Sequence, residues 1–70
     1  MREVEITVEP VELYKILKFE GLVSSGGAAK SVIDEGQVLV NGEVETRKRK
    51  KIVSGDVSEF GGEKLNIQPQ

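Results

Sequence analysis

The chain has 70 residues, 37% of them hydrophobic, with ten lysines and arginines against twelve acids and no cysteine or histidine. That length allows one small domain, which we expect to span residues 1–70. The missing residue types exclude a disulfide framework, thiol chemistry and any catalytic triad or metal site that needs histidine. No apolar run approaches the roughly 18 residues of a membrane-spanning helix, and no signal-peptide pattern opens the chain, so we expect a cytoplasmic protein.

The first third of the chain predicts a strand and a helix. Val4, Ile6 and Val8 alternate with polar residues, which predicts a strand over residues 3–8. Pro10 ends it and suits the first turn of a helix that runs to about Phe19. The expected buried stripe of this helix is Leu13, Ile16 and Leu17. Gly21 ends the helix, and the residues expected to fill the core at the following corner are Phe19, Leu22 and Val23.

A second helix is predicted between a serine cap and Gly36. Ser24 or Ser25 supplies the N-cap, and Gly36 takes the position that follows many helix ends. One apolar face is predicted, made of Ala28, Ala29, Val32 and Ile33, and an opposite face made of Gly26, Gly27, Lys30 and Asp34. The two helices are expected to be short and antiparallel.

The second half of the chain predicts antiparallel strands. Val38 and Val40 alternate, Asn41-Gly42 is typical of a two-residue hairpin turn, and Val44 begins the return strand. Further on, a turn at residues 54–56 precedes a strand over 57–60, a second turn at 61–62 leads to a final strand around 65–67, and residues 68–70 are expected to be frayed. The fold class is therefore α+β, with the helices packed on a small, mostly antiparallel sheet.

Five consecutive cations follow the hairpin: Arg47, Lys48, Arg49, Lys50 and Lys51. In an extended chain they would point alternately to two sides. Lysines can simply protect a sheet edge, but five contiguous cations exceed that need and repel one another. Because acids elsewhere are screened beyond a Debye length of about 8 Å, the net charge of −2 does not exclude a local phosphate-binding strip. We favour nucleic-acid contact.

The start of the second helix, Ser25 to Lys30, contains two adjacent glycines. Gly26 and Gly27 fall where backbone amides lack helical partners, so a phosphate could approach those amides closely, with Lys30 beside it. The alternative is that the glycines allow tight packing of the helix–helix turn. The sequence does not decide between these two interpretations.

No pattern in the sequence predicts catalysis. The scattered acids resemble solvated faces, and the only aromatic residues, Tyr14, Phe19 and Phe60, fall at core-like positions. We expect no enzymatic activity, no cofactor and no metal ion.

The order of these motifs resembles the alpha-L RNA-binding domain of the small-subunit ribosomal protein S-four type. The matching elements are Leu13-x-x-x-Leu17, Ser25 to Lys30, Ile33-x-x-Gly36, Val38-x-Val40-Asn41-Gly42 and Gly55-Asp56-x-x-x-Phe60. Further strings, such as Lys18-Phe19-Glu20-Gly21, are similar to the stand-alone YbcJ-like branch of that family.

The resemblance implies that the protein binds structured ribosomal or transfer RNA through its two-helix face and hairpin. It places Ser25, Lys30 and Asn41 at that face and Lys18 on its rim. Many members carry an arginine after the serine, where this chain has Gly26-Gly27, so backbone amides or the basic run would have to replace that contact. We expect a monomer. The alternative function is a protein-interaction adaptor whose acidic N-terminal segment docks a basic partner.

Overall fold

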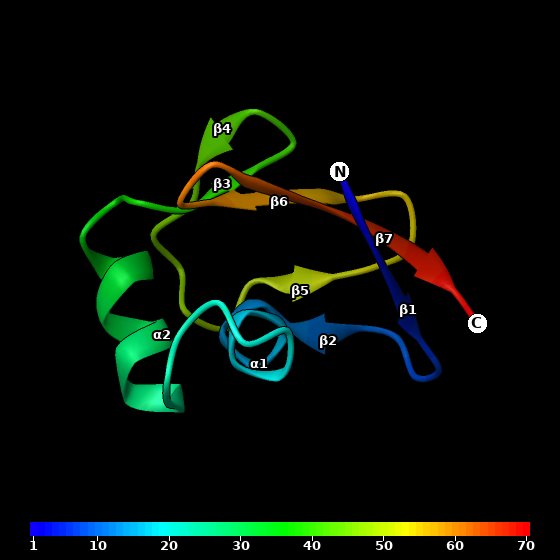
Figure 1. Cartoon of the computed structure of the whole chain (residues 1–70), viewed down its shortest axis with the longest axis horizontal. Helices are drawn as coiled ribbons and strands as arrows, with labels where there is room; N and C mark the ends of the chain where they lie inside the picture. Colours follow the sequence, from blue (N-terminus) through cyan, green and yellow to red (C-terminus); the bar gives the residue numbers. More distant parts are fainter.

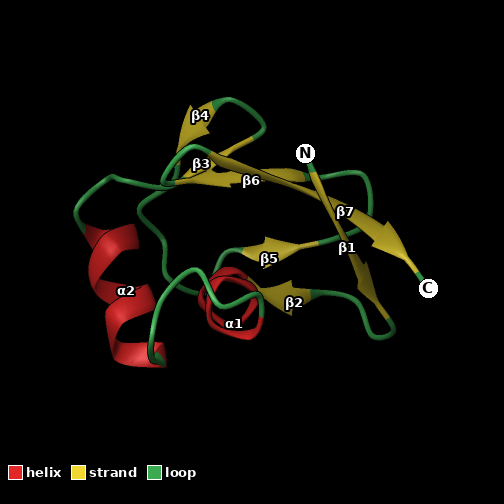
Figure 2. Ribbon diagram, in the orientation of Figure 1, coloured by secondary structure: helices red, strands yellow, loops and turns green.

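The computed structural model describes residues 1–70, which form two short helices and seven strands (Figures 1 and 2). In chain order the elements are β1 (Arg2–Ile6), β2 (Val11–Glu12), α1 (Leu13–Phe19), α2 (Gly26–Asp34), β3 (Leu39–Val40), β4 (Glu43–Val44), β5 (Lys51–Ile52), β6 (Val57–Phe60) and β7 (Glu63–Pro69). This is the predicted α+β class. Figure 1 looks nearly along the axis of α1 and shows α2 from the side, so the helices cross rather than run antiparallel.

The main sheet has five strands in the order β1-β7-β6-β3-β4, and a separate two-stranded ladder pairs β2 with β5. All pairs are antiparallel except β1 with β7, which run parallel with Val4 opposite Ile67. The predicted hairpin at Asn41-Gly42 is present, with Val40 opposite Glu43. The sheet is therefore mixed but mostly antiparallel, as expected.

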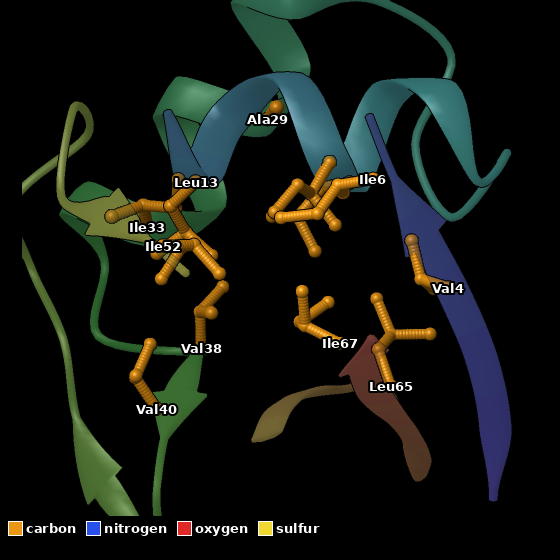
Figure 3. Packing of buried hydrophobic residues seen from close by; sticks show 12 residues of the cluster. Val4, Ile6, Leu13, Ala29, Ile33, Val38, Val40, Ile52, Leu65 and Ile67 are labelled. Carbon is orange, nitrogen blue, oxygen red and sulfur yellow. The ribbon is translucent and has the colours of Figure 1, made fainter. Parts of the chain in front are cut away.

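Both helices, the five-stranded sheet and the β2–β5 ladder contribute side chains to one hydrophobic core. The predicted stripe of α1 is buried, as are two residues of the apolar face predicted for α2. Figure 3 shows these side chains meeting those of the strands beneath α1. The buried cluster consists of Val4, Ile6, Leu13, Ile16, Leu17, Ala29, Ile33, Val38, Val40, Ile52, Leu65 and Ile67.

Three predictions about the first third of the chain are wrong. Pro10 does not lie in the first turn of the helix, because the strand β2 follows it and α1 begins only at Leu13. The first strand covers Arg2–Ile6 rather than residues 3–8, because the chain turns away from β7 after Ile6 to bring β2 onto β5. Val8 is consequently 70% exposed. Phe19 does not fill the core: as the last residue of α1 it lies off the buried stripe and is also 70% exposed. Leu22 and Val23 do pack against the core at the corner.

The C-terminal residues are ordered in the sheet rather than frayed. Gln68 and Pro69 belong to β7 and lie opposite Glu5 and Ile6 of β1. The backbone N–H of Gln70 donates to the Ile6 carbonyl at 3.1 Å. A parallel partner from the other end of the chain leaves no local signal in the sequence, which is why the tail was misjudged.

Candidate nucleic-acid interface

The basic run is a turn and not an extended strip. Lys48 and Arg49 occupy the turn, and the N–H of Lys50 donates to the Arg47 carbonyl at 3.2 Å. Only Lys51 lies in a strand, β5. The predicted alternation of the five side chains to two sides is therefore wrong. The chain turns at Lys48 and Arg49, which brings it against α1 before it enters β5.

Backbone carbonyls of the basic run bind the start of α1. The first amides of a helix lack intrahelical acceptors, and the N-cap residue Glu12 makes no side-chain capping bond. In its place the N–H of Leu13 donates to the Lys50 carbonyl at 3.0 Å, and that of Tyr14 donates to the Lys48 carbonyl at 3.2 Å. The basic run is thereby fixed against the helix and not free to swing away from it.

Three cations from separate segments surround the ring of Tyr14. The ammonium of Lys30, from α2, lies 4.6 Å from the ring centre. Lys15 Nζ, from α1, lies 5.9 Å away, and the guanidinium carbon of Arg49 lies 6.0 Å away. All three distances are within the range of cation–π attraction. We call these four residues, Tyr14, Lys15, Lys30 and Arg49, the basic surface.

The first turn of α2 borders the basic surface. Ser25 is the N-cap, and its Oγ accepts from the Ala28 N–H at 3.1 Å, which resolves the choice between the two predicted serines. A Cβ added to Gly26 would lie 3.8 Å from Cε2 of Tyr14, and one added to Gly27 would lie 3.9 Å from Ser25 Oγ. Both are ordinary contact distances. The structure therefore does not support tight packing as the reason for the two glycines.

Two carboxylates are paired with the cations. The carboxylate of Glu45 accepts two hydrogen bonds from the Arg47 guanidinium, Nε to Oε2 at 2.9 Å and Nη2 to Oε1 at 3.1 Å. The hydrogen bond from Arg47 lowers the pKa of Glu45, and the same bond raises the pKa of Arg47. Glu12 lies 3.2 Å from Lys15 Nζ and 3.9 Å from Arg49 Nε. The hydrogen bond with Lys15, with smaller help from Arg49, lowers the pKa of Glu12.

Asn41 is used by the fold. Its Oδ1 accepts from the Val57 N–H at 2.9 Å, and its Nδ2 donates to Asp56 Oδ1 at 3.1 Å. Its φ of 54° lies in the left-handed region that asparagine tolerates in a tight turn. These bonds connect the β3–β4 turn to the start of β6. They account for the asparagine without any ligand.

The predicted site residues fall into two groups. The structure brings Gly26, Lys30 and Arg49 together around Tyr14, whereas Arg47 follows β4 and lines one hollow with Asn41. Five lysines form no ion pair with any acid: Lys18, Lys30, Lys48, Lys50 and Lys51. Lys18 is exposed one helical turn after Tyr14.

Sequence reasoning missed Tyr14, Lys15 and the two paired carboxylates. Tyr14 falls at a core-like position in the sequence, and no local pattern distinguishes Lys15 from an ordinary polar residue of a helix. Their closeness to Lys30 and Arg49 depends on how α1, α2 and the basic run dock, which no local pattern reports.

Two features that would change the functional interpretation, a membrane-spanning helix and a cluster of acidic metal ligands, are absent. Neither helix has the length and hydrophobicity that crossing a lipid bilayer demands. The acidic side chains nowhere gather in a group of three or more that could hold a metal ion.

Comparison with known proteins supplies relatives of similar length. "Putative RNA-binding protein YbcJ" of Escherichia coli strain K12 is 53% identical over 57 residues, covering 81% of each chain. "Probable ribosome maturation protein RlbA" of Bacillus subtilis strain 168 is 39% identical over 59 residues, covering 84% of this chain and 83% of the relative. These names describe no enzymatic activity.

A solved structure and a family match agree with these relatives. The solution structure of E. coli YbcJ, described as revealing an alpha-L motif involved in RNA binding, superimposes with a TM-score of 0.74 at 46% identity. The superposition covers 97% of this chain and 87% of the other, so the two share the alpha-L fold. Residues 4–68 match the S4 domain. The chain therefore belongs to the S4 domain family, and within it resembles YbcJ.

Proposed function

We propose that this protein binds structured RNA without catalysis, and that the basic surface and the unpaired lysines of the basic run contact its phosphates. The observation that carries the proposal is the gathering of Lys15, Lys30 and Arg49 around Tyr14 beside the open first turn of α2. Glu12 is the one acid that pairs with these three cations, through Lys15 and Arg49, so the group keeps a net positive charge that an anionic ligand neutralises.

The geometry suits a phosphate backbone. Amides of the first turn of α2 have no helical acceptors, and the side chains at Gly26 and Gly27 are absent, so a phosphate oxygen can approach the N–H groups. Lys30 and Arg49 then supply charge within the same surface. Lys18, Lys48, Lys50 and Lys51 extend the positive potential around it. Asn41 acts indirectly, by holding the hairpin that carries Arg47.

The names of the relatives support ribosomal RNA as the ligand. YbcJ is named for RNA binding and RlbA for ribosome maturation. Ribosomal RNA is the substrate class that fits both names, with transfer RNA as the second structured candidate. Such a role implies a cytoplasmic location, and we expect one protein molecule to bind as a monomer.

Salt dependence and a charge-reversal variant test the proposal. Neutralising about four to six phosphates gives a slope of roughly −3 to −5 in log affinity against log salt. We expect that slope for a ribosomal RNA hairpin, measured by fluorescence anisotropy. The double variant Lys30→Glu, Arg49→Glu should lose most of the affinity and keep its circular dichroism spectrum.

Lys64→Glu is the matched control, because Lys64 is an exposed cation on β7 that pairs with Glu59 and takes no part in the basic surface. It should bind RNA nearly as the unaltered protein does. Equal affinity of the folded double variant and the control would disprove the proposed surface. Hydrolysis or modification of the RNA by the purified protein would disprove the non-catalytic role.

A further inference from the structure

A groove separate from the basic surface lies between β1 and α1. Its volume is about 240 Å³, and none of the four residues of the basic surface lines it. Five consecutive residues, 4–8, form one wall, and the other wall includes Ile16 and Phe19 of α1. The same helix thus presents Tyr14 to one surface and Phe19 to another.

The groove exposes apolar side chains that nothing in the fold covers. Val8 and Phe19 are each 70% exposed, although both line the groove. Contiguous apolar surface of this kind on a small protein indicates a place where another molecule packs. The volume is below the roughly 300 Å³ of small-molecule sites, which favours side chains of a peptide over a metabolite.

One wall of the groove follows the free edge of the sheet. β1 is an outermost strand and pairs only with β7. Its other edge therefore offers main-chain N–H and C=O groups to a further strand, and β1 contains no proline; its exposed charges, Glu3 and Glu5, oppose pairing with an acidic strand but not with a basic one. A groove between an edge strand and a helix is suited to binding an extended peptide by strand addition.

The negative charge of the groove indicates the charge of the partner that fits it. Two carboxylates, Glu5 and Glu20, are among its lining residues, and no cation is. Glu3 is exposed on the same face of β1 as Glu5. The nearest cation, Arg2, lies 3.8 Å from Glu20 and 4.0 Å from Glu63, which leaves Glu3 and Glu5 without an ion pair. The complement of this surface is a positively charged segment.

We propose that the groove binds an extended segment of a partner protein in which apolar and basic residues alternate, added as a strand to the free edge of β1. Its apolar side chains pack on Val8, Ile16 and Phe19, and its basic side chains face the unpaired Glu3 and Glu5 on the other face of β1. This goes beyond RNA binding: the domain holds RNA on one flank of α1 and a basic protein segment on the other.

A peptide titration followed by NMR tests the proposal. The probe is an acetylated peptide of alternating lysine and valine, added to the ¹⁵N-labelled full chain. We expect saturable shifts of the amides of β1 and Phe19. Phe19→Ser and Glu5→Lys should each lower the affinity for the peptide by about tenfold, a loss typical of a central interface residue. Val44→Ser, which alters a 60% exposed residue on the opposite edge strand β4, is the matched control and should change nothing.

Four outcomes would overturn the proposal. They are absent or non-saturating shifts, equal binding of a glutamate–valine peptide, equal binding of a lysine–valine peptide whose backbone amides are methylated, and Phe19-dependent dimerisation that occupies the groove without peptide. RNA affinity is measured on the same variants and should be unchanged, so failure of the groove is distinguishable from failure of the RNA surface.

Discussion

Lys30 Nζ lies 4.6 Å from the centre of the Tyr14 ring, and this contact joins α2 to α1 in the middle of the basic surface. It fixes a long side chain that would otherwise be mobile, so that its charge stays next to the open first turn of α2. Tyr14 is therefore the positioning residue of the surface, even though it carries no charge itself.

Replacing the Tyr14 ring should distinguish its role in positioning Lys30 from its contribution as a bulky side chain. Tyr14→Leu removes the cation–π contacts, and we expect it to lower the RNA affinity and to reduce the free energy of unfolding by about 1 kcal/mol. Tyr14→Phe retains the ring face and should preserve both quantities. Urea unfolding and anisotropy on the two variants provide the measurement. Similar RNA affinities for Leu and Phe would show that the ring does not position Lys30.

We expect Glu45 to compete with RNA for Arg47. Because Glu45 holds the guanidinium at two points, Glu45→Gln should release Arg47 and raise the RNA affinity severalfold at low salt. Glu43→Gln removes the same charge from an exposed hairpin residue that forms no ion pair, and serves as the control. If both variants gain affinity equally, the effect is one of net charge and not of a freed arginine.

Acidification should lower the stability of the fold through the carboxylates of Glu12 and Glu45. The pKa values of Glu12 and Glu45 are lowered in the folded chain, so each favours folding above the unfolded-state pKa of about 4.3. That contribution is lost as the pH falls below this value through the folded-state pKa. We expect the urea midpoint to drop between pH 5 and about pH 3, and to drop less in the double variant Glu12→Gln, Glu45→Gln. An equal drop in both proteins would assign the loss to other acids.

The two glycines of α2 can be tested directly. Gly27→Ala should raise the free energy of unfolding by up to about 1 kcal/mol, because alanine favours helix and the added Cβ meets no obstacle. It should leave RNA binding nearly intact, whereas Gly27→Leu should reduce RNA binding while the fold persists. Melting temperature and anisotropy on both variants are the measurements. A lowered melting temperature for Gly27→Ala would restore the packing explanation.

Asn41 is expected to matter for stability and not for direct RNA contact. Asn41→Ala removes two side-chain hydrogen bonds and places alanine at a φ of 54°, so we expect the free energy of unfolding to fall by about 1–3 kcal/mol. At a temperature where the variant is fully folded, RNA affinity should be close to that of the unaltered protein. A well-folded variant with greatly reduced affinity would return Asn41 to the RNA surface.

Local patterns predicted much of the fold. The stripe of Leu13, Ile16 and Leu17, the cap at Ser25 and the turn at Asn41-Gly42 each depend on neighbours a few residues apart, and all three are confirmed. The misjudged features depend on distant partners. Phe19 is exposed because it lies off the buried stripe of α1, and the basic run forms a turn whose carbonyls accept from the first amides of that helix.

The same distinction applies to the candidate site. The sequence identified most of the cations, because clustered charge is visible without a structure. It did not identify Tyr14 as their centre or Glu45 as a competitor, since both relationships need the tertiary fold. Whether these residues contact RNA stays a prediction.

The parallel pairing of β1 with β7 has a consequence for biosynthesis. β1 leaves the ribosome before the other strands of this domain, and it acquires its only sheet partner when residues 63–69 have also emerged from the exit tunnel. Until then Val4 and Ile6 remain unpaired, and the groove beside them lacks a formed wall. We therefore expect the domain to complete its sheet late in translation, in a single closing step that brings the two ends of this sequence together.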